Sequence, residues 1–317
     1  MTDNSLVSVQ HLDRHYGELT AVANVSFELE QGEVLGFLGP NGAGKSTTMQ
    51  IITGNLAPSA GSIKICGIDL TEHPKQAKAE IGFLPEQPPL YRELSVDEYL
   101  GFCARLNRIR RNKIQQAVDR VKQRCGLEEV GKRLINNLSK GYQQRVGIAQ
   151  AVIHSPSIVV LDEPTVGLDP IQIREIRALI RELGKEHGVI LSTHILPEVQ
   201  MTCDRVQIIN RGRLVFSDSV SNLNRQRDSR SLLLTLQQPP AETELLTIAE
   251  VERVEHLGGG QWRIHHRPDA SPATRLAERA VAGHWGLAEL SPEYTSLEQI
   301  FIDITTSEAG HHEEQAA

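Results

Sequence analysis

The sequence has few cysteines, few aromatic residues and no long apolar run. Its four cysteines, spread over 317 residues without a Cys-x-x-Cys pair, argue against a disulfide framework or a zinc site. The most apolar stretches, such as 158–161, fall far short of the about twenty residues that span a bilayer. The N-terminus also lacks the basic and apolar regions of a signal peptide. We therefore expect a cytoplasmic protein with reduced thiols.

The balance of charge also argues against one class of partner. Aromatic residues make up 4% of the chain, and the formal net charge is −7. A protein that binds nucleic acid through a broad surface carries an excess of Lys and Arg on it. We accordingly expect no nucleic-acid partner.

The length and a change in composition after residue 217 predict two domains. We expect an α/β domain over 1–217, a polar linker over 218–230 and a small α+β domain over 231–308. The polar tail 309–317 is predicted to be disordered.

Periodicity predicts the architecture of the first domain. Apolar and polar residues alternate over 5–29, which is typical of antiparallel strands. The segment 95–152 has helical periodicity throughout, with helix starts at Ser95 and Ser139. Short apolar strands are predicted at 34–38, 158–161, 189–192 and 206–209, the middle two separated by a helix. Strands alternating with helices imply a mainly parallel, buried sheet, into which the helical block is inserted.

The second domain has its own strand and helix pattern. Strands are predicted at 232–236, 254–257, 261–265 and 287–290, and helices near 242–251 and 273–282. That order predicts a split-βαβ, ferredoxin-like sandwich. Its core would use Trp262, Ile264, Trp285 and Leu287. The pairs His265-His266 and His311-His312 have no further ligands at metal-site spacing, so we interpret them as surface residues.

Residues 39–46 read Gly-Pro-Asn-Gly-Ala-Gly-Lys-Ser and match the phosphate-loop pattern G-x-x-x-x-G-K-[ST]. The loop lies between an apolar strand and a helix, as that pattern requires. Glycines let backbone N–H groups converge on phosphates, and the helix N-terminus adds positive potential. We expect Lys45 to reach the β- and γ-phosphates and Ser46 to bind Mg²⁺. The predicted nucleotide-binding residues here are Gly39, Asn41, Gly42, Gly44, Lys45, Ser46 and Thr47.

Two carboxylates end the apolar strand that starts at residue 158. Buried parallel strands deliver their C-terminal ends to the ligand crevice, so Asp162 is expected to bind Mg²⁺. Glu163, one residue further on, is expected to act as the general base for the attacking water. His194 ends another strand at the same crevice.

Residues 138–145, Leu-Ser-Lys-Gly-Tyr-Gln-Gln-Arg, resemble the signature sequence of ABC ATPases. The resemblance covers about 6–215 and implies an ABC-ATPase core with an antiparallel β subdomain and an inserted helical subdomain. It further implies that Tyr16 stacks on adenine, that Gln87 contacts Mg²⁺ and the attacking water, and that His194 contacts the γ-phosphate. By the same resemblance Asp169 belongs to the loop that links two active sites.

The signature departs from the usual Leu-Ser-Gly-Gly-Gln at two positions, Lys140 and Tyr142. Ser139 and Gly141 keep the hydroxyl and the close backbone approach that a γ-phosphate needs, so only these two are carried over as nucleotide-binding residues. The sequence Lys-Gly-Tyr and the ending at 296–301 are similar to those of one subgroup of ABC subunits, which serve drug export, gliding motility and nitrous-oxide-reductase maturation.

The resemblance also implies partners. Two copies would pack head to tail around two Mg-ATP and drive a separate transmembrane permease, in an exporter, from the inner face of the cell membrane. One alternative is a soluble ABC ATPase that acts on ribosomes or DNA; such proteins usually carry two cassettes or long coiled coils, and this chain has neither. A GTPase or kinase would leave the signature, Gln87 and His194 unexplained, and nothing indicates a purely structural module.

Overall fold

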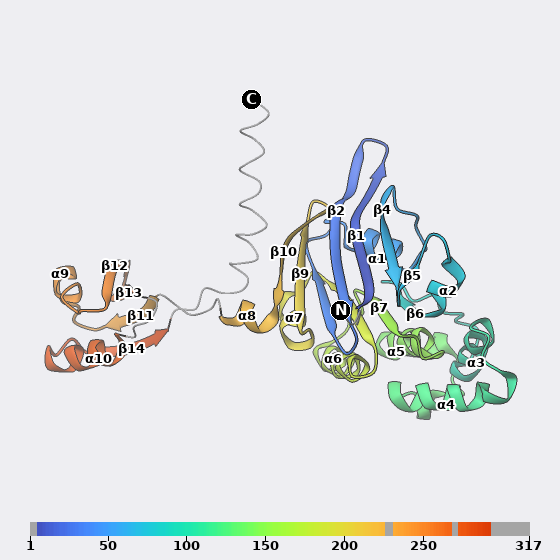
Figure 1. Ribbon diagram of the computed structural model, residues 1–317. Helices are drawn as coiled ribbons and strands as arrows, with labels where there is room; N and C mark the ends of the chain where they lie inside the picture. Colours follow the sequence, from blue (N-terminus) through green and yellow to red (C-terminus); the bar gives the residue numbers. More distant parts are fainter. Residues whose placement is uncertain (1–4, 226–230, 268–271, 293–317) are drawn as a thin grey trace. The chain divides into compact units, whose positions relative to one another are not determined.

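The chain divides into two compact units, residues 1–220 and 221–317, in the computed structural model (Figure 1). The structure describes residues 5–225, 231–267 and 272–292. Each unit has its own hydrophobic core, one built from residues between Val7 and Ile209 and the other from residues between Leu232 and Trp285. Two cores suit a chain of 317 residues, because a single core stops growing at about 250–300 residues.

The N-terminal strands form a four-stranded antiparallel sheet in the order β2-β1-β4-β5. Val9 pairs with Phe27 on one side and with Ile63 on the other, and all three are buried. The antiparallel pair predicted within 5–29 is confirmed. The strands are β1 (Ser5–Tyr16), β2 (Leu19–Glu30), β4 (Ala60–Ile65) and β5 (Ile68–Asp69).

The central sheet has the order β10-β9-β3-β8-β7-β6. Five of these strands run parallel, and only β10 is antiparallel to its neighbour. Every residue of β3, β7 and β8 is buried, as expected for strands covered on both faces. The mainly parallel sheet is confirmed. Its strands are β3 (Val34–Leu38), β6 (Ile81–Leu84), β7 (Ile158–Asp162), β8 (Gly188–Thr193), β9 (Arg205–Asn210) and β10 (Arg213–Ser219).

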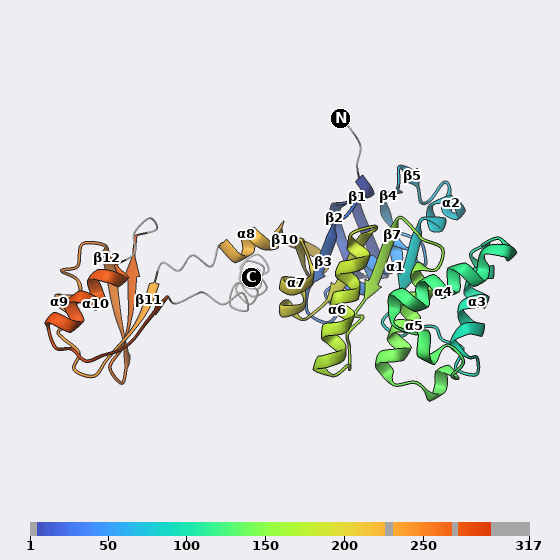
Figure 2. The same cartoon turned by 90° about the horizontal axis from the view of Figure 1, so that it is seen from below.

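Three helices gather at one side of the first unit and form the predicted insertion (Figure 1, Figure 2). They are α3 (Val96–Leu106), α4 (Ile114–Cys125) and α5 (Lys140–Val152), with short 3-10 turns at Arg111–Lys113, Glu128–Val130 and Ile135–Asn137. Both predicted start signals are confirmed. Ser95 and Glu98 form a reciprocal capping box, and the Tyr142 N–H donates to the Ser139 hydroxyl.

The other helices of this part of the chain connect the strands. They are α1 (Lys45–Ile52), α2 (Pro74–Ala79), α6 (Pro170–Gly184), α7 (Leu196–Thr202) and α8 (Val220–Arg225). The linker predicted over 218–230 is wrong in its first part, because β10 continues to Ser219 and α8 occupies 220–225. Residues 226–230 and the tail 309–317 lie outside the described residues. No helix in the described ranges is long and apolar enough to cross a membrane.

The second unit is a four-stranded antiparallel sheet in the order β12-β13-β11-β14 with two helices. In chain order the central pair is the first and third strand, which is the ferredoxin-like arrangement. The predicted succession of strands and helices is confirmed. The elements are β11 (Ser231–Leu236), α9 (Glu242–Leu245), β12 (Val251–Gly258), β13 (Gln261–His266), α10 (Ala273–Ala282) and β14 (Leu287–Pro292).

Three details of the second unit differ from the sequence prediction. The helix predicted over 242–251 is only α9, because the chain turns after it and Val251 already belongs to β12. Leu287 is exposed at the start of edge strand β14, and Leu290 packs against the core instead. His266 is buried rather than on the surface, since the two-residue period of β13 places it on the same face as Trp262 and Ile264. His311 and His312 lie outside the described residues.

A chain that ends at residue 220 is expected to fold alone, because every residue of the first core precedes it. We predict a single cooperative thermal transition and a far-ultraviolet circular dichroism spectrum typical of a folded α/β protein. A chain that ends at residue 203 is the matched control: it lacks β9, a buried strand of the central sheet, and should not unfold cooperatively. Loss of the cooperative transition in the longer of these two chains would show that the first unit depends on the second.

Candidate active site

The site is built where three neighbouring strands of the central sheet end. Strand β8 lies between β3 and β7, and all three are parallel. Leu38 at the end of β3 pairs with Thr193, and Asp162 at the end of β7 pairs with Ser192. The segments that follow these strands therefore emerge at one edge of the sheet, where α/β folds bind ligands.

The loop after β3 leads directly into α1. Gly44 has a φ of 105°, and a Cβ on it would lie 2.5 Å from the carbonyl oxygen of Ala21. Only glycine fits this position, since both the backbone angle and the space exclude a side chain. Helix α1 begins with Lys45, whose Nζ donates to the carbonyl oxygens of Gly39, at 2.8 Å, and Pro40, at 3.2 Å. The loop thus presents backbone N–H groups, a helix N-terminus and an ammonium group together.

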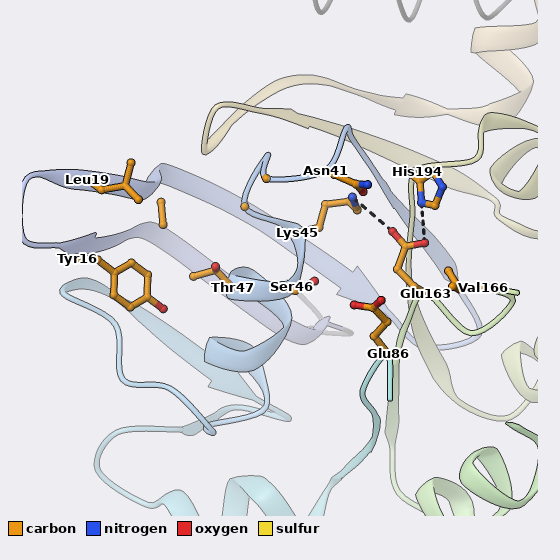
Figure 3. A pocket seen from close by; sticks show the side chains of 13 residues that line it. Tyr16, Leu19, Asn41, Lys45, Ser46, Thr47, Glu86, Glu163, Val166 and His194 are labelled. Atoms are coloured by element: carbon orange, nitrogen blue, oxygen red, sulfur yellow. Dashed lines mark hydrogen bonds and ion pairs between the residues drawn. The ribbon is translucent and has the colours of Figure 1, made fainter. Parts of the chain in front are cut away.

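Glu163 lies between a cation and an imidazole (Figure 3). One carboxylate oxygen is 3.4 Å from Lys45 Nζ, and the other is 2.9 Å from His194 Nδ1. The Glu163 side chain is buried, and its backbone adopts a left-handed φ of 50°. This conformation costs a non-glycine residue on the order of 1–3 kcal/mol and persists only where the surroundings hold it. Its backbone N–H donates to the Ser192 carbonyl oxygen at 3.0 Å, which ties the turn to β8.

Asp162 has the burial and the free carboxylate oxygen expected of a metal ligand. The side chain is 3% exposed, and its Oδ1 is buried without a hydrogen-bond partner among the described residues. A buried, unpaired carboxylate oxygen is costly unless a cation or a donor completes it. No group of three or more His, Cys, Asp or Glu side chains in the described ranges could hold a metal by itself. A hard cation that keeps waters and phosphate oxygens as ligands, such as Mg²⁺, needs only one or two protein groups.

Lys45, Glu163 and His194 line a cavity of about 560 Å³. Its volume is in the range of small-ligand sites. Nine predicted residues line it: Tyr16, Asn41, Gly42, Gly44, Lys45, Ser46, Thr47, Glu163 and His194. Four residues that the sequence reasoning missed also line it: Leu19, Ala21, Glu86 and Val166.

Tyr16 lies at the end of the cavity opposite to Glu163, with Ser46 and Thr47 between them (Figure 3). Tyr16 is 45% exposed. The guanidinium carbon of Arg14 lies 4.6 Å from the ring centroid, so Arg14 covers the ring by a cation–π contact. An aromatic ring at one end and a phosphate-type loop at the other suit a ligand with a flat base and a polyphosphate.

Six predicted residues do not line this cavity: Gly39, Gln87, Ser139, Gly141, Asp162 and Asp169. Gln87 lines a second cavity of about 490 Å³, which shares Glu86 and Val166 with the first. Ser139 caps α5, and Asp169 caps α6 by accepting two backbone N–H groups. No residue of the signature-like sequence 138–145 lines the first cavity, and three of its residues, Lys140, Gln143 and Gln144, line the second.

Lys140 and Tyr142, the two residues that depart from the usual signature, are both exposed. Lys140 extends toward the turn that precedes α6: a Cβ on Gly167 would lie 2.1 Å from Lys140 Nζ. Gly141 is buried against the side chain of Gln172. Lys140 thus contacts the turn before Asp169 within its own chain.

One missed residue had a usable signal. Glu86 follows the end of β6, so the strand-end argument that selected Glu163 would have selected it as well. Leu19, Ala21 and Val166 carry no chemical signal, and only the folded chain brings them to the cavity.

Comparison with known proteins identifies the family. The ABC transporter family profile matches residues 22–166. An uncharacterized ABC transporter ATP-binding protein, YxlF of Bacillus subtilis, is 35% identical over 299 residues, which cover 94% of this chain and 99% of that protein. The chain belongs to the ABC transporter ATP-binding proteins. The region that includes residues 22–166 is therefore an ATP-binding domain of the ABC ATPase type.

Other relatives extend the comparison. The bacitracin transport ATP-binding protein BcrA of Bacillus licheniformis is 37% identical over 214 residues, covering 67% of this chain and 69% of that protein. A solved ATP-binding subunit of an ABC transporter is 32% identical, with a TM-score of 0.63 over 70% of this chain and 92% of that one. The resemblance to ABC subunits of the drug-export type is confirmed by such relatives.

The tight fit at Gly44 gives a prediction. Gly44→Ala should weaken ATP binding by about tenfold or more, because the new Cβ would force the loop away from the Ala21 carbonyl group. Gly67→Ala is the matched control: its φ is also positive, at 77°, but nothing lies within 4 Å of the added Cβ. Isothermal titration calorimetry with ATP measures both. Equal affinities in the two variants would contradict the role given to the loop.

Proposed function

We propose that the chain binds Mg-ATP and hydrolyses it to drive a separate membrane permease. The observation that carries the proposal is the buried Glu163 carboxylate, 3.4 Å from Lys45 and 2.9 Å from His194 at the edge of one cavity. Family membership makes ATP the ligand, and the geometry supports the role that we propose for each group.

In this proposal adenine stacks on Tyr16, and the triphosphate extends along Ser46 and Thr47 toward Lys45. Backbone N–H groups of the loop and the N-terminus of α1 bind the phosphates. Lys45 now shares its ammonium group between two carbonyl oxygens and Glu163. A γ-phosphate would compete for that cation, because charge-assisted contacts to phosphate are strong.

Hydrolysis then depends on Glu163 as the general base. Its carboxylate takes a proton from the attacking water, while His194 holds the second carboxylate oxygen and contacts the γ-phosphate. Ser46 and Asp162 would hold the Mg²⁺ ion, with Gln87 as a further ligand, and the ion would neutralise charge on the β- and γ-phosphate oxygens.

Glu163→Gln should keep ATP binding and lower turnover by about 10²–10⁴-fold, the usual range for loss of a general base. Glu186→Gln is the control, because that carboxylate lies on the surface in an ion pair with Arg124. Single-turnover hydrolysis with radiolabelled ATP measures the rate. Turnover of the Glu163 variant within about threefold of wild type would contradict the role as base.

We further propose that two copies pack head to tail, so that Ser139 and Gly141 of one copy complete the cavity of the other. This is supported by the placement of these residues outside the cavity of their own chain. Ser139 begins helix α5, and the N-terminus of a helix attracts a phosphate group. A two-fold axis would then create two equal sites.

Complementation tests this arrangement. Ser139→Arg and Lys45→Ala homodimers should both be inactive, but a mixture should recover about a quarter of wild-type ATPase activity, since half of the dimers would contain one intact site. Lys45→Ala mixed with Glu163→Gln is the control. These two residues contact each other in one chain, so every mixed site would carry a defect. No recovery in the first mixture would refute the shared site.

The permease partner and an export direction are supported by the names of relatives that serve transport of bacitracin or resistance to linearmycin. We place the chain on the inner face of the cell membrane through that permease. Residues 221–317 contain no second phosphate-loop sequence, so we assign them to subunit pairing or its regulation. A chain that ends at residue 220 should accordingly retain ATP affinity.

A further inference from the structure

A second buried carboxylate, Glu198, lies behind the reacting groups. It belongs to α7 and is 1% exposed. Its Oε2 accepts the Thr193 hydroxyl at 2.7 Å, and its Oε1 accepts the Thr165 hydroxyl at 2.5 Å. Both threonines are buried as well. Glu198 does not line the cavity, so ATP would not contact it.

The two threonines flank the reacting side chains. Thr193 directly precedes His194, and its hydroxyl also accepts the backbone N–H of Ile195 at 3.1 Å. Thr165 follows Glu163 by two residues. The Glu198 carboxylate therefore spans the segments that carry the base and the imidazole, and it connects them on the side away from the cavity.

A third element contributes to the same carboxylate. Arg177 of α6 has its Nη2 atom 3.5 Å from Glu198 Oε1. Two hydroxyl donors and a guanidinium group stabilise a buried carboxylate that would otherwise be unfavourable in the protein interior. Hydrogen bonds to a charged group are also about twice as strong as neutral ones. The Glu198 carboxylate is thus held by Thr165, Thr193 and Arg177, which lie on three separate segments of the chain.

Rigidity matters at this position because the Glu163 backbone is left-handed, with a φ of 50°. Such a conformation persists only where the surrounding structure fixes it. The Thr165–Glu198 hydrogen bond holds the turn directly after Glu163, and the Thr193–Glu198 hydrogen bond holds the segment directly before His194.

We propose that Glu198 is a positioning residue that keeps Glu163 and His194 at hydrogen-bonding distance for ATP hydrolysis. The inference rests on the proposed function. A residue that acts only on stability would lower the melting temperature and leave the turnover of each ATP-bound site unchanged. A positioning residue must lower that turnover itself.

Glu198→Ala in the full-length chain should lower the single-turnover rate constant of ATP hydrolysis by about tenfold or more. A misplacement of reacting groups by about 1 Å can cost on the order of a hundredfold in rate. The Kd for ATP should stay within about threefold of wild type, because Glu198 does not line the cavity. Glu198→Gln should restore most of the rate, as an amide can bond both threonine hydroxyls. The control is Glu186→Ala, a surface acid that should leave both values unchanged.

Thr165→Val and Thr193→Val each remove one hydroxyl group at nearly constant shape, and they test the same claim if Glu198→Ala does not fold. Each should lower kcat without raising Kd. Unchanged kcat per bound ATP in these variants and in Glu198→Ala would overturn the inference. Glu163→Gln is measured alongside: if it turns over normally, the proposed function fails, whereas if it is inactive and Glu198→Ala is not, only the Glu198 inference fails.

Discussion

Three parallel strands that end side by side determine where chemistry can occur in this protein. Because β3, β8 and β7 are neighbours in register, the phosphate loop, His194 and Glu163 emerge at one edge of the central sheet. Each strand is fully buried, so the positions of these ends are set by core packing and not by surface loops. The Lys45–Glu163 and His194–Glu163 contacts are consequences of that register.

The same constraint explains why the site is polar and yet buried. Glu163 is compensated by an ammonium group and an imidazole, and behind it Glu198 is compensated by two hydroxyl groups and Arg177. Unpaired, either carboxylate would be unfavourable in the protein interior. Of these two paired carboxylates only Glu163 lines the cavity, and both hold the segment in which the Glu163 backbone is strained.

Nine of the fifteen predicted site residues line the cavity, and the sequence signals that select them are local. Glycine spacing identifies the loop, and a carboxylate directly after an apolar strand identifies Asp162 and Glu163. The role of Glu198 was not predicted, since its partners lie 5 and 33 positions away and no local pattern joins them. In the second unit, periodicity located every strand but made the helix near 242–251 too long. The helix ends at Leu245, and Ile248 is buried in the core from the turn that follows.

We propose that one chain forms most of an ATP site and that a second copy completes it. The placement of Ser139 outside the cavity leads to this claim, and mass action gives its most direct test. The measurement is the ATPase activity per chain of the purified protein, followed over a wide range of protein concentration. Activity per chain should rise with concentration and then reach a plateau as pairs form. Activity per chain that stays constant on dilution to concentrations at which sedimentation finds only monomers would contradict it.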